Sequence, residues 1–438
     1  MSGYRTLHRE VYLDADEADE ADVTGSQSEP FPLWAVKFSP CRQSKMVSAA
    51  TSPLRLLTAS ADGMIHAYEL ADKLASGAGG SALDASAVKM RKTSVLLGKD
   101  QDFPVKNSIA LGCAAFDLCR NYGGSDPQTG DEIVVGVELD GTVRVWCRDE
   151  QPSTVDSMAD DPGGEDPKLV RAEVEFQVAG ATGTTCAIRP PSLGPAHGSH
   201  SWMKVRPVLV AALGCLDGSV AIVSTGVALH LRSNDAETLD AESQPLAAEG
   251  GKVCDRLGTG SAVPTSLAWS PSSDTIAIGR KDGTVSIYNI GANDLAEGTG
   301  SYKRIHQIMF HHQPVRGLAF TSDAALLIVG DDEGTLTIHD VVQPRPSTVM
   351  GMVGSVVNAH MSYILSLSAL TDGKRFVTSG ADGLVQVWDV GMINSGPVHT
   401  FADSRGTGMV WGSSTSVDGM RLASAHDNGM LAVYSSDE

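Results

Sequence analysis

Short runs of alternating apolar and polar residues recur along the chain, and each ends at a tight polar-glycine step. Strands with one buried face alternate in this way, and a two-residue hairpin favours Asp-Gly or Asn-Gly because glycine tolerates a positive φ. The pattern predicts seven hairpins. Their turns are Asp62-Gly63, Asp140-Gly141, Asp217-Gly218, Asp282-Gly283, Glu333-Gly334, Asp382-Gly383 and Asn428-Gly429.

A further alternating run precedes each hairpin, as in VRGLAF at 315–320 and MVWGSST at 409–415. Each repeat therefore supplies three strands, and we expect a fourth before the next repeat begins. Four antiparallel strands repeated seven times fit a β-propeller, in which closure of the ring protects the strand edges. We predict an all-β chain that forms a single seven-bladed β-propeller over residues 1–438.

The repeats divide the chain into seven units and leave surplus sequence between the earlier ones. We expect units at 31–110, 111–180, 181–260, 261–310, 311–355, 356–403 and 404–435. The turn glycines at 63, 141, 218 and 283 are more widely spaced than those at 283, 334, 383 and 429. Insertions rich in Gly, Ser, Ala, Asp and Pro are expected as loops at 71–91, 149–168, 190–204 and 234–260.

The last unit, at 404–435, has no sequence after it that could supply a fourth strand. A β-like run at 4–13 belongs to no unit, and we expect this N-terminal strand to pair with the last blade and close the ring. The acidic stretch at 14–22 would then be a solvated connector. A tail without structure is the alternative.

Charge and cysteine content narrow the classes of partner. Acidic residues outnumber basic ones 53 to 33, which leaves a formal net charge of −20. Such a surface repels phosphate backbones and anionic lipids, so we expect no direct binding to nucleic acid or membrane. The short basic stretch at 89–92 is interpreted as part of a loop. Seven scattered cysteines fit a reducing compartment.

Motifs for catalysis and cofactor binding are missing from the sequence. The Gly258-Thr259-Gly260 run lacks the third glycine and the strand-helix context of a dinucleotide site. The histidines at 306, 311 and 312 have no cysteine or carboxylate partner at metal-ligand spacing. We therefore predict no catalytic residue, no metal and no cofactor.

One repeat ends in the dipeptide Trp388-Asp389, and another keeps only the aromatic residue, at Trp146. In this respect the repeats resemble the WD-repeat family. The resemblance implies that the blades carry structural hydrogen bonds at set positions of the repeat.

The sixth unit matches the structural hydrogen-bonded set of that family at four positions: His360, Thr378, Asp382 and Trp388. The resemblance implies that these residues tie a blade together and that His360 is neither a catalyst nor a ligand. A second structural histidine is expected at His312.

Residues 265–434 and 31–70 resemble the WD-repeat subunit of the superkiller complex more closely, through the HTF-x-D segment at 399–403 and the VWG triplet at 410–412. The resemblance implies a noncatalytic, monomeric propeller within a hetero-complex. Its partners would be a tetratricopeptide-repeat scaffold and an RNA helicase, and its role would be in exosome-dependent 3′-to-5′ decay of mRNA.

That likeness also implies a cytoplasmic location. Because the animal counterpart joins the polymerase-associated factor complex, a nuclear location and this second partner stay open. A WD-repeat adaptor of a chromatin, ubiquitin-ligase or ciliary assembly is the main alternative. An enzyme that uses the propeller channel is a third.

Large residues near the start of the inner strands are the candidate partner-binding residues: Trp34, Arg316, Tyr363 and Trp411. Large amphipathic side chains supply contact area at low entropic cost. We expect them near the channel mouth on blades seven, one, five and six. Packing of each aromatic inside its own blade is the alternative.

The expected ligand of this patch is an extended segment with an apolar anchor and an arginine. Acidic neighbours that could pair with such an arginine are Asp331, Asp332 and Asp403.

Overall fold

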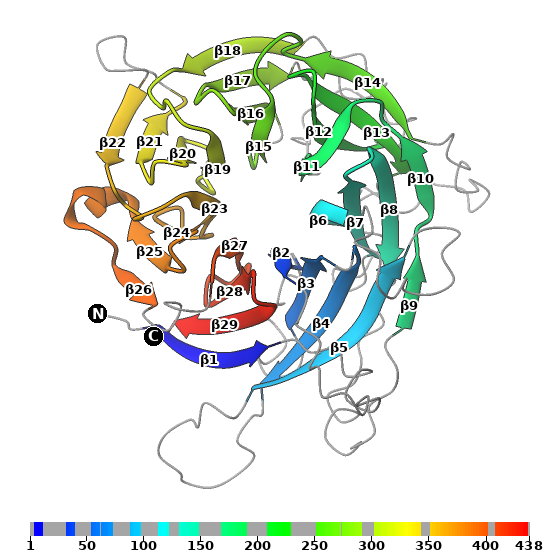
Figure 1. Ribbon diagram of the computed structural model, residues 1–438, viewed down its shortest axis with the longest axis horizontal. Coiled ribbons are helices and arrows are strands. Elements are labelled where there is room, and N and C mark those ends of the chain that lie inside the picture. The colour runs from blue at the N-terminus through cyan, green and yellow to red at the C-terminus, as the bar shows by residue number, and fades with distance from the viewer. Residues whose placement is uncertain are drawn as a thin grey trace, which may run out of the picture.

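The computed structural model shows seven β-sheets arranged as blades around a central axis (Figure 1). The structure describes residues 4–11, 32–39, 54–61, 63–72, 88–97, 113–121, 131–148, 168–190, 208–228, 251–272, 274–290, 302–342, 351–401 and 408–436. The predicted seven-bladed, all-β propeller is confirmed.

In the first three blades, the strands are separated by the longest stretches of sequence. Blade 1 has β2 (Leu33–Phe38), β3 (Leu54–Ser60), β4 (Ile65–Asp72), β5 (Val88–Leu97) and, unexpectedly, a fifth strand, β9 (Lys168–Arg171). Blade 2 has β6 (Cys113–Asn121), β7 (Asp131–Glu138), β8 (Thr142–Arg148) and β10 (Val174–Gln177). Blade 3 has β11 (Ala181–Ile188), β12 (Val208–Cys215), β13 (Val220–Ala228) and β14 (Lys252–Leu257).

The later blades are more regular. Blade 4 has β15 (Pro264–Trp269), β16 (Thr275–Arg280), β17 (Val285–Ile290) and β18 (Tyr302–Ile308). Blade 5 has β19 (Val315–Phe320), β20 (Leu326–Asp331), β21 (Leu336–Asp340) and β22 (Met352–Val356). Blade 6 has β23 (Ile364–Ala369), β24 (Arg375–Gly380), β25 (Val385–Asp389) and β26 (His399–Phe401), with the 3₁₀ helix η6 (Val390–Ser395) before β26.

Blade 7 joins the two ends of the chain. It has β27 (Val410–Thr415), β28 (Arg421–His426), β29 (Met430–Ser436) and β1 (Tyr4–Val11). The N-terminal strand β1 lies antiparallel to β29, from Tyr4 opposite Ser436 to Val11 opposite Met430. The predicted closing strand is therefore confirmed, and Figure 1 shows it on the outer edge of the last blade.

Several expected loops contain outer strands instead. Strand β14 lies inside the expected insertion 234–260, and the basic stretch 89–92 is part of β5. The expected loops 71–91 and 149–168 likewise overlap the ends of β4, β5 and β9. One edge of an outer strand faces solvent, and its apolar residues alternate only weakly. In β14, for example, most residues are exposed or half-buried. The sequence of such a strand is therefore hard to distinguish from that of a loop. Residues 14–22 and 191–204 lie outside the described residues.

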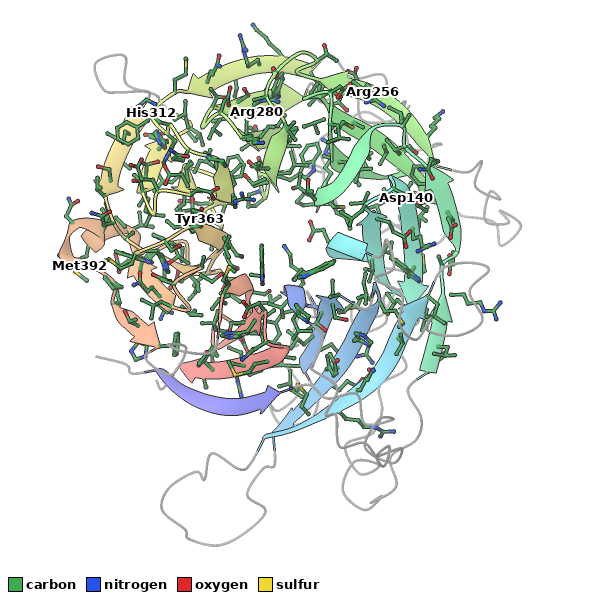
Figure 2. The ribbon with its side chains drawn as sticks, viewed as in Figure 1. Asp140, Arg256, Arg280, His312, Tyr363 and Met392 are labelled. Carbon is green, nitrogen blue, oxygen red and sulfur yellow. The ribbon has the colours of Figure 1, made fainter. Side chains whose placement is uncertain are left out.

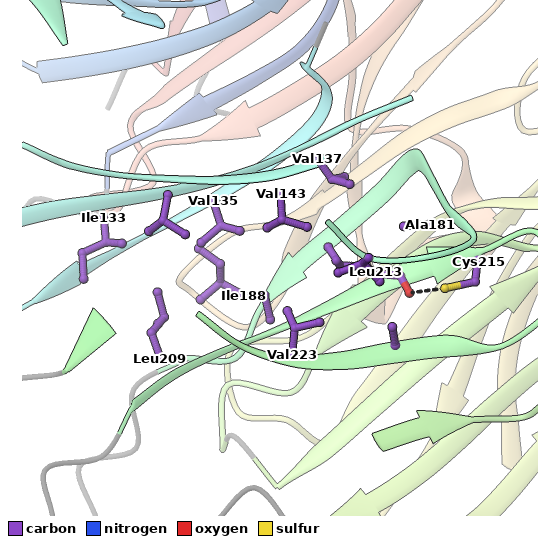
Figure 3. Close-up of a cluster of buried hydrophobic side chains, with 14 residues drawn as sticks. Ile133, Val135, Val137, Val143, Ala181, Ile188, Leu209, Leu213, Cys215 and Val223 are labelled. Carbon is purple, nitrogen blue, oxygen red and sulfur yellow. Dashed lines mark hydrogen bonds between the residues drawn. The ribbon is translucent and has the colours of Figure 1, made fainter. Parts of the chain in front are cut away.

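The hydrophobic core lies between neighbouring blades. Figure 3 shows one such cluster, in which Val135 and Val143 of blade 2 face Leu209, Leu213 and Val223 of blade 3. Both faces of a blade are covered in this way, so β12 (VLVAALGC) and the middle of β7 (IVVGV) lack polar side chains other than a cysteine. Burial of this apolar surface is the main favourable contribution to folding.

One face of the ring carries both the hairpin turns and the starts of the inner strands. In blade 6 the turn residue Ala381 donates its N–H to the carbonyl of Tyr363, just before β23, at 2.9 Å. Asp332 donates to Pro314 in blade 5 at 3.0 Å, and equivalent bonds occur in blades 1, 4 and 7. We call this side of the propeller the hairpin face.

The loops of the hairpin face also connect neighbouring blades. Gly334, in the turn of blade 5, has a φ of 76° and accepts a hydrogen bond at its carbonyl from Ala359 N–H, 2.9 Å away, on the way into blade 6. A side chain at Gly334 would meet the carbonyl of His360. The glycine is therefore required both by the turn and by the close approach of the next loop.

Candidate functional site

The second residue of several inner strands is a β-bulge. Register shifts between Leu33 and Ala35, Val315 and Gly317, Ile364 and Ser366, and Val410 and Gly412 leave one residue of each strand unpaired. A bulge re-aims the side chain of the extra residue. The bulged residues are Trp34, Arg316, Leu365 and Trp411.

Three of the four sequence-predicted partner-binding residues therefore occupy one equivalent position. Arg316 is exposed, whereas the indoles of Trp34 and Trp411 are half-buried. Tyr363 is different, because it lies just before β23 and the bulge of blade 6 belongs to Leu365. Tyr363 is nevertheless 49% exposed, and Figure 2 shows it on the inner side of the ring.

Arg316 has a partner within its own blade. Arg316 Nε lies 2.6 Å from Asp332 Oδ1 in the hairpin turn of blade 5. The interpretation of Asp331 as an available acid is wrong, because its side chain is buried and lies 2.7 Å from His311 Nδ1. Asp403 lies outside the described residues.

The structure brings His360, Thr378, Asp382 and Trp388 together in one chain of hydrogen bonds. Trp388 Nε1 lies 2.9 Å from Thr378 Oγ1, and that hydroxyl lies 2.7 Å from His360 Nε2. His360 Nδ1 lies 2.9 Å from Asp382 Oδ1. Because an indole N–H can only donate, the threonine accepts from Trp388 and donates to Nε2, which leaves Nδ1–H to donate to the carboxylate.

Asp382 connects this buried network to an exposed loop. Its Oδ2 accepts a hydrogen bond from Met361 N–H at 3.0 Å, and its Oδ1 accepts one from Leu384 N–H at 3.1 Å. The Met361 side chain is 86% exposed. The network therefore fixes the backbone of a loop that presents an apolar side chain to solvent.

The ionisation of Asp382 is tied to these contacts. Burial by itself would raise the pKa of its carboxyl, but hydrogen bonding and electrostatic interaction with His360, together with backbone donors, hold the pKa below the usual 3.8. A carboxylate whose pKa is lower in the folded state stabilises the fold above its unfolded pKa. That contribution is lost as the pH falls through the folded pKa.

We expect Asp382→Asn to lower the free energy of unfolding near neutral pH by about 1–3 kcal/mol, since a charge-assisted bond to a buried histidine is lost. Asparagine can still hold the turn, as Asn428 does in blade 7 through Met430 N–H at 3.0 Å. Urea denaturation of the wild type and the variant from about pH 7 to about pH 3 measures the difference between their free energies of unfolding. This difference should become smaller below the ordinary carboxyl pKa. A difference in the free energy of unfolding that stays constant over this pH range would exclude a contribution from the charge of Asp382.

Blade 5 carries a related network that the sequence did not reveal. His311, not His312, is the buried histidine, with Nδ1 near Asp331 and Nε2 2.8 Å from Thr337 Oγ1. His339 Nε2 lies 2.9 Å from the same hydroxyl, so His339 stands where Trp388 does in blade 6. The prediction of His312 is wrong because its side chain is exposed. Adjacent histidines give no signal of which one points inward.

Five exposed apolar side chains lie on the hairpin face, in the loops that lead into blades 5, 6 and 7. Met309, Val357 and Met361 are 67%, 66% and 86% exposed, whereas Tyr363 and Met409 are 49% and 38% exposed. We call this set the apolar arc. Its members are Met309, Val357, Met361, Tyr363 and Met409. Only Tyr363 was expected from the sequence, because methionine and valine in irregular loops follow no period.

The described part of the chain contains no group of three or more His, Cys, Asp or Glu side chains placed to hold a metal ion. Within the same residues, no helix has both the length and the apolar character that a bilayer crossing requires.

Two family models match the later blades. The model of the anaphase-promoting complex subunit 4 WD40 domain matches residues 267–350, and the model of the WD domain, G-beta repeat, matches residues 352–389. Together they cover blade 4 from its inner strand and run through the Trp388-Asp389 dipeptide of blade 6.

Individual relatives are similar over part of the chain. WD repeat-containing protein 1 of Rattus norvegicus is 29% identical over 138 residues, which are 31% of this chain and 20% of that protein. A guanine nucleotide-binding protein subunit beta of Oryza sativa subsp. japonica is 25% identical over 169 residues, 38% of this chain and 43% of that protein. An uncharacterised WD repeat-containing protein of Schizosaccharomyces pombe is 27% identical over 124 residues, 28% of this chain and 21% of that protein.

The matched segment thus spans about a fifth of the length of the first of these relatives. No enzyme family is among the matched family models, and WD40 propellers typically act as noncatalytic scaffolds that bind protein partners. The chain is therefore similar to WD40-repeat proteins over residues 267–389, and its seven blades have the architecture of a β-propeller.

Proposed function

We propose that this propeller is a noncatalytic scaffold that holds a protein partner on its hairpin face, at the mouth of the channel. The observation that carries the proposal is the apolar arc, which gathers exposed Met309, Val357, Met361 and Tyr363 in neighbouring loops. Exposed apolar side chains gathered on one face are typical of an interaction surface, whereas single ones are not.

The bulged residues extend this surface toward the axis. Trp34, Arg316 and Trp411 occupy equivalent positions in blades 1, 5 and 7. Large aromatic and arginine side chains are the commonest anchors of protein interfaces. The ion pair between Arg316 and Asp332 offers a polar rim beside the apolar arc. An extended segment with apolar anchors would fit this combination.

The finer proposal is a subunit of a superkiller-type complex. It rests on the likeness of residues 265–434 and 31–70 to the WD-repeat subunit of that complex. In that role the chain would bind a tetratricopeptide-repeat scaffold, assist an RNA helicase in exosome-dependent mRNA decay, and reside in the cytoplasm. An adaptor in a polymerase-associated factor, chromatin, ubiquitin-ligase or ciliary assembly is the alternative.

Affinity purification with mass spectrometry tests both the scaffold proposal and the superkiller proposal. We expect the wild-type chain to capture defined partners, and the double variant Met361→Ser/Tyr363→Ser to lose at least about tenfold of that capture, since truncation of interface anchors costs about 2 kcal/mol or more. The matched control is Met392→Ser in η6, which is 56% exposed and follows β25 on the opposite side of the blade. It should capture partners like the wild type.

The identity of the captured proteins separates the two assemblies. Recovery of a helicase together with a tetratricopeptide-repeat protein supports the superkiller role. Recovery of other partners, lost in the same double variant, supports the adaptor role. If the double variant and the Met392 control capture partners equally well, the docking surface lies elsewhere.

A further inference from the structure

Two thioethers of the apolar arc lie open to solvent. Met361 is 86% exposed, which is the largest exposed fraction among the large apolar side chains that the structure describes. Met309, in the loop that leads into blade 5, is 67% exposed. Met64 and Met430, by contrast, are buried. Because oxidation of a methionine requires that the oxidant reach its sulfur, the structure divides these methionines into two reactive and two protected ones.

The loop that carries Met361 is held on both sides of that residue. Its N–H donates to Asp382 Oδ2 at 3.0 Å, and the preceding His360 is buried in the hydrogen-bonded network of blade 6. Two residues further on, the carbonyl of Tyr363 accepts a hydrogen bond from Ala381 N–H at 2.9 Å. Turning Met361 inward would break these bonds, so its thioether stays on the docking surface.

We propose that Met361 and Met309 are sites of reversible oxidation by peroxides, and that their sulfoxides release a partner from the hairpin face. A lone pair of Sδ attacks one peroxide oxygen, the O–O bond breaks and an S–O bond forms. With hydrogen peroxide, the departing hydroxide takes the proton of the transferred oxygen and leaves as water. The sulfur loses two electrons, and the peroxide gains them.

The product changes the chemistry of the docking surface. A sulfoxide is polar, whereas the thioether that it replaces is a flexible apolar group, and this change disrupts interfaces that depend on methionine. A sulfoxide buried against an apolar anchor of the partner has an oxygen without a hydrogen-bond donor, which lowers the affinity. Release of the partner rests on the proposed function, whereas oxidation of the two methionines does not.

Reduction would restore the apolar arc. Two methionine sulfoxide reductases, one for each sulfoxide epimer, return the thioether. The sulfoxide oxygen leaves as water while two thiols of the reductant become a disulfide. The exposed positions of Met361 and Met309 give such enzymes access to both side chains.

Peptide mapping by mass spectrometry measures the oxidation of each methionine in purified full-length protein treated with hydrogen peroxide. We expect Met361 and Met309 to be oxidised at least about tenfold faster than the buried Met430. In urea-unfolded protein, the reference state, the three rates should be similar. On a phenyl column, the oxidised wild type should elute earlier because the arc has become polar. Met309→Leu/Met361→Leu keeps apolar side chains that peroxide does not oxidise, so its elution should shift less.

Partner capture connects oxidation to docking. The treated protein is freed of peroxide with catalase and used as bait in an untreated lysate. Only proteins whose capture is lost in Met361→Ser/Tyr363→Ser are counted. Capture by the wild type should fall roughly tenfold after oxidation and recover after incubation with both reductases and dithiothreitol. Met309→Leu/Met361→Leu, compared with its own untreated sample, should lose little. Met392→Leu removes an exposed methionine at the periphery of the ring (Figure 2) and should lose as much capture as the wild type.

Three results would overturn the proposal. The first is oxidation of Met361 no faster than that of Met430. The second is equal capture by the oxidised and the untreated wild type. The third is an equal loss of capture by Met309→Leu/Met361→Leu, which would place the damage at another residue. Failure of the scaffold proposal gives a different result, because capture is then independent of Met361 and Tyr363 even before oxidation. The oxidation rates and the shift in elution still test the two methionines in that case.

Discussion

Trp388→Ala is expected to lower the free energy of unfolding by about 3–5 kcal/mol, the usual cost of replacing a buried tryptophan with alanine. The indole is 1% exposed, and its ring stacks on Phe376 with centroids 6.4 Å apart. Its N–H also donates to Thr378, which would be left to find another donor. Chemical denaturation with urea, followed by tryptophan-independent far-UV circular dichroism, measures the loss.

Two further variants separate the contributions to this effect. Trp388→Phe keeps an aromatic ring but removes the N–H, so it should cost about 1–3 kcal/mol. Trp411→Ala is the same chemical change at a half-buried bulge, and it should cost less than half as much as Trp388→Ala. If Trp411→Ala is equally destabilising, Trp411 belongs to the core of its blade and not to the docking surface.

Removal of residues 1–11 is expected to open the ring. The truncated chain would lose all seven register pairs between β1 and β29 and would leave β29 as an exposed edge. Each ladder hydrogen bond contributes about 0.5–1.5 kcal/mol, so the loss should be roughly 3 kcal/mol or more. We also expect concentration-dependent aggregation, because an unpaired edge pairs with other chains. Thermal unfolding and light scattering measure the two effects.

A synthetic peptide of residues 1–13 provides the decisive control. Added in excess, it should restore the melting temperature of the truncated chain by mass action, since it binds only the folded ring. A chain lacking only residues 1–3, which precede β1, should behave like the full-length protein. If truncation of residues 1–11 leaves the unfolding transition unchanged, the other six blades close the ring without the strand.

The hairpins were predictable because their physics is local. A turn such as Asp382-Gly383 needs a residue that tolerates positive φ, and Gly383 has a φ of 76°. The strands next to it, β24 (RFVTSG) and β25 (VQVWD), alternate apolar and polar residues, which makes them recognisable in the sequence. The position of β1 was also predictable, because the last unit lacked a fourth strand and the N-terminal run was the strand left without a unit.

The outer strands were harder to predict because one of their edges faces solvent. β14 and β5 were taken for loops, and their sequences mix charged and apolar residues without a clear period. The hydrogen-bond network of blade 5 could not be predicted from the sequence either. Its threonine and carboxylate occupy other positions of the repeat than those of blade 6, so His311, Asp331 and Thr337 match no fixed pattern.

The sequence by itself determined the number of blades and their hairpin turns, because these depend on residues adjacent in the chain. It also indicated the strand that closes the ring, because the last unit has no fourth strand of its own and the run at 4–13 belongs to no unit. The tertiary structure alone decided which side chains share a surface. The apolar arc joins the loops that lead into blades 5, 6 and 7, and the parallel pairing of β5 with β9 brings residues 94–97 beside 168–171. Neither has a sequence period, since contacts between separate segments are fixed only when the whole ring packs.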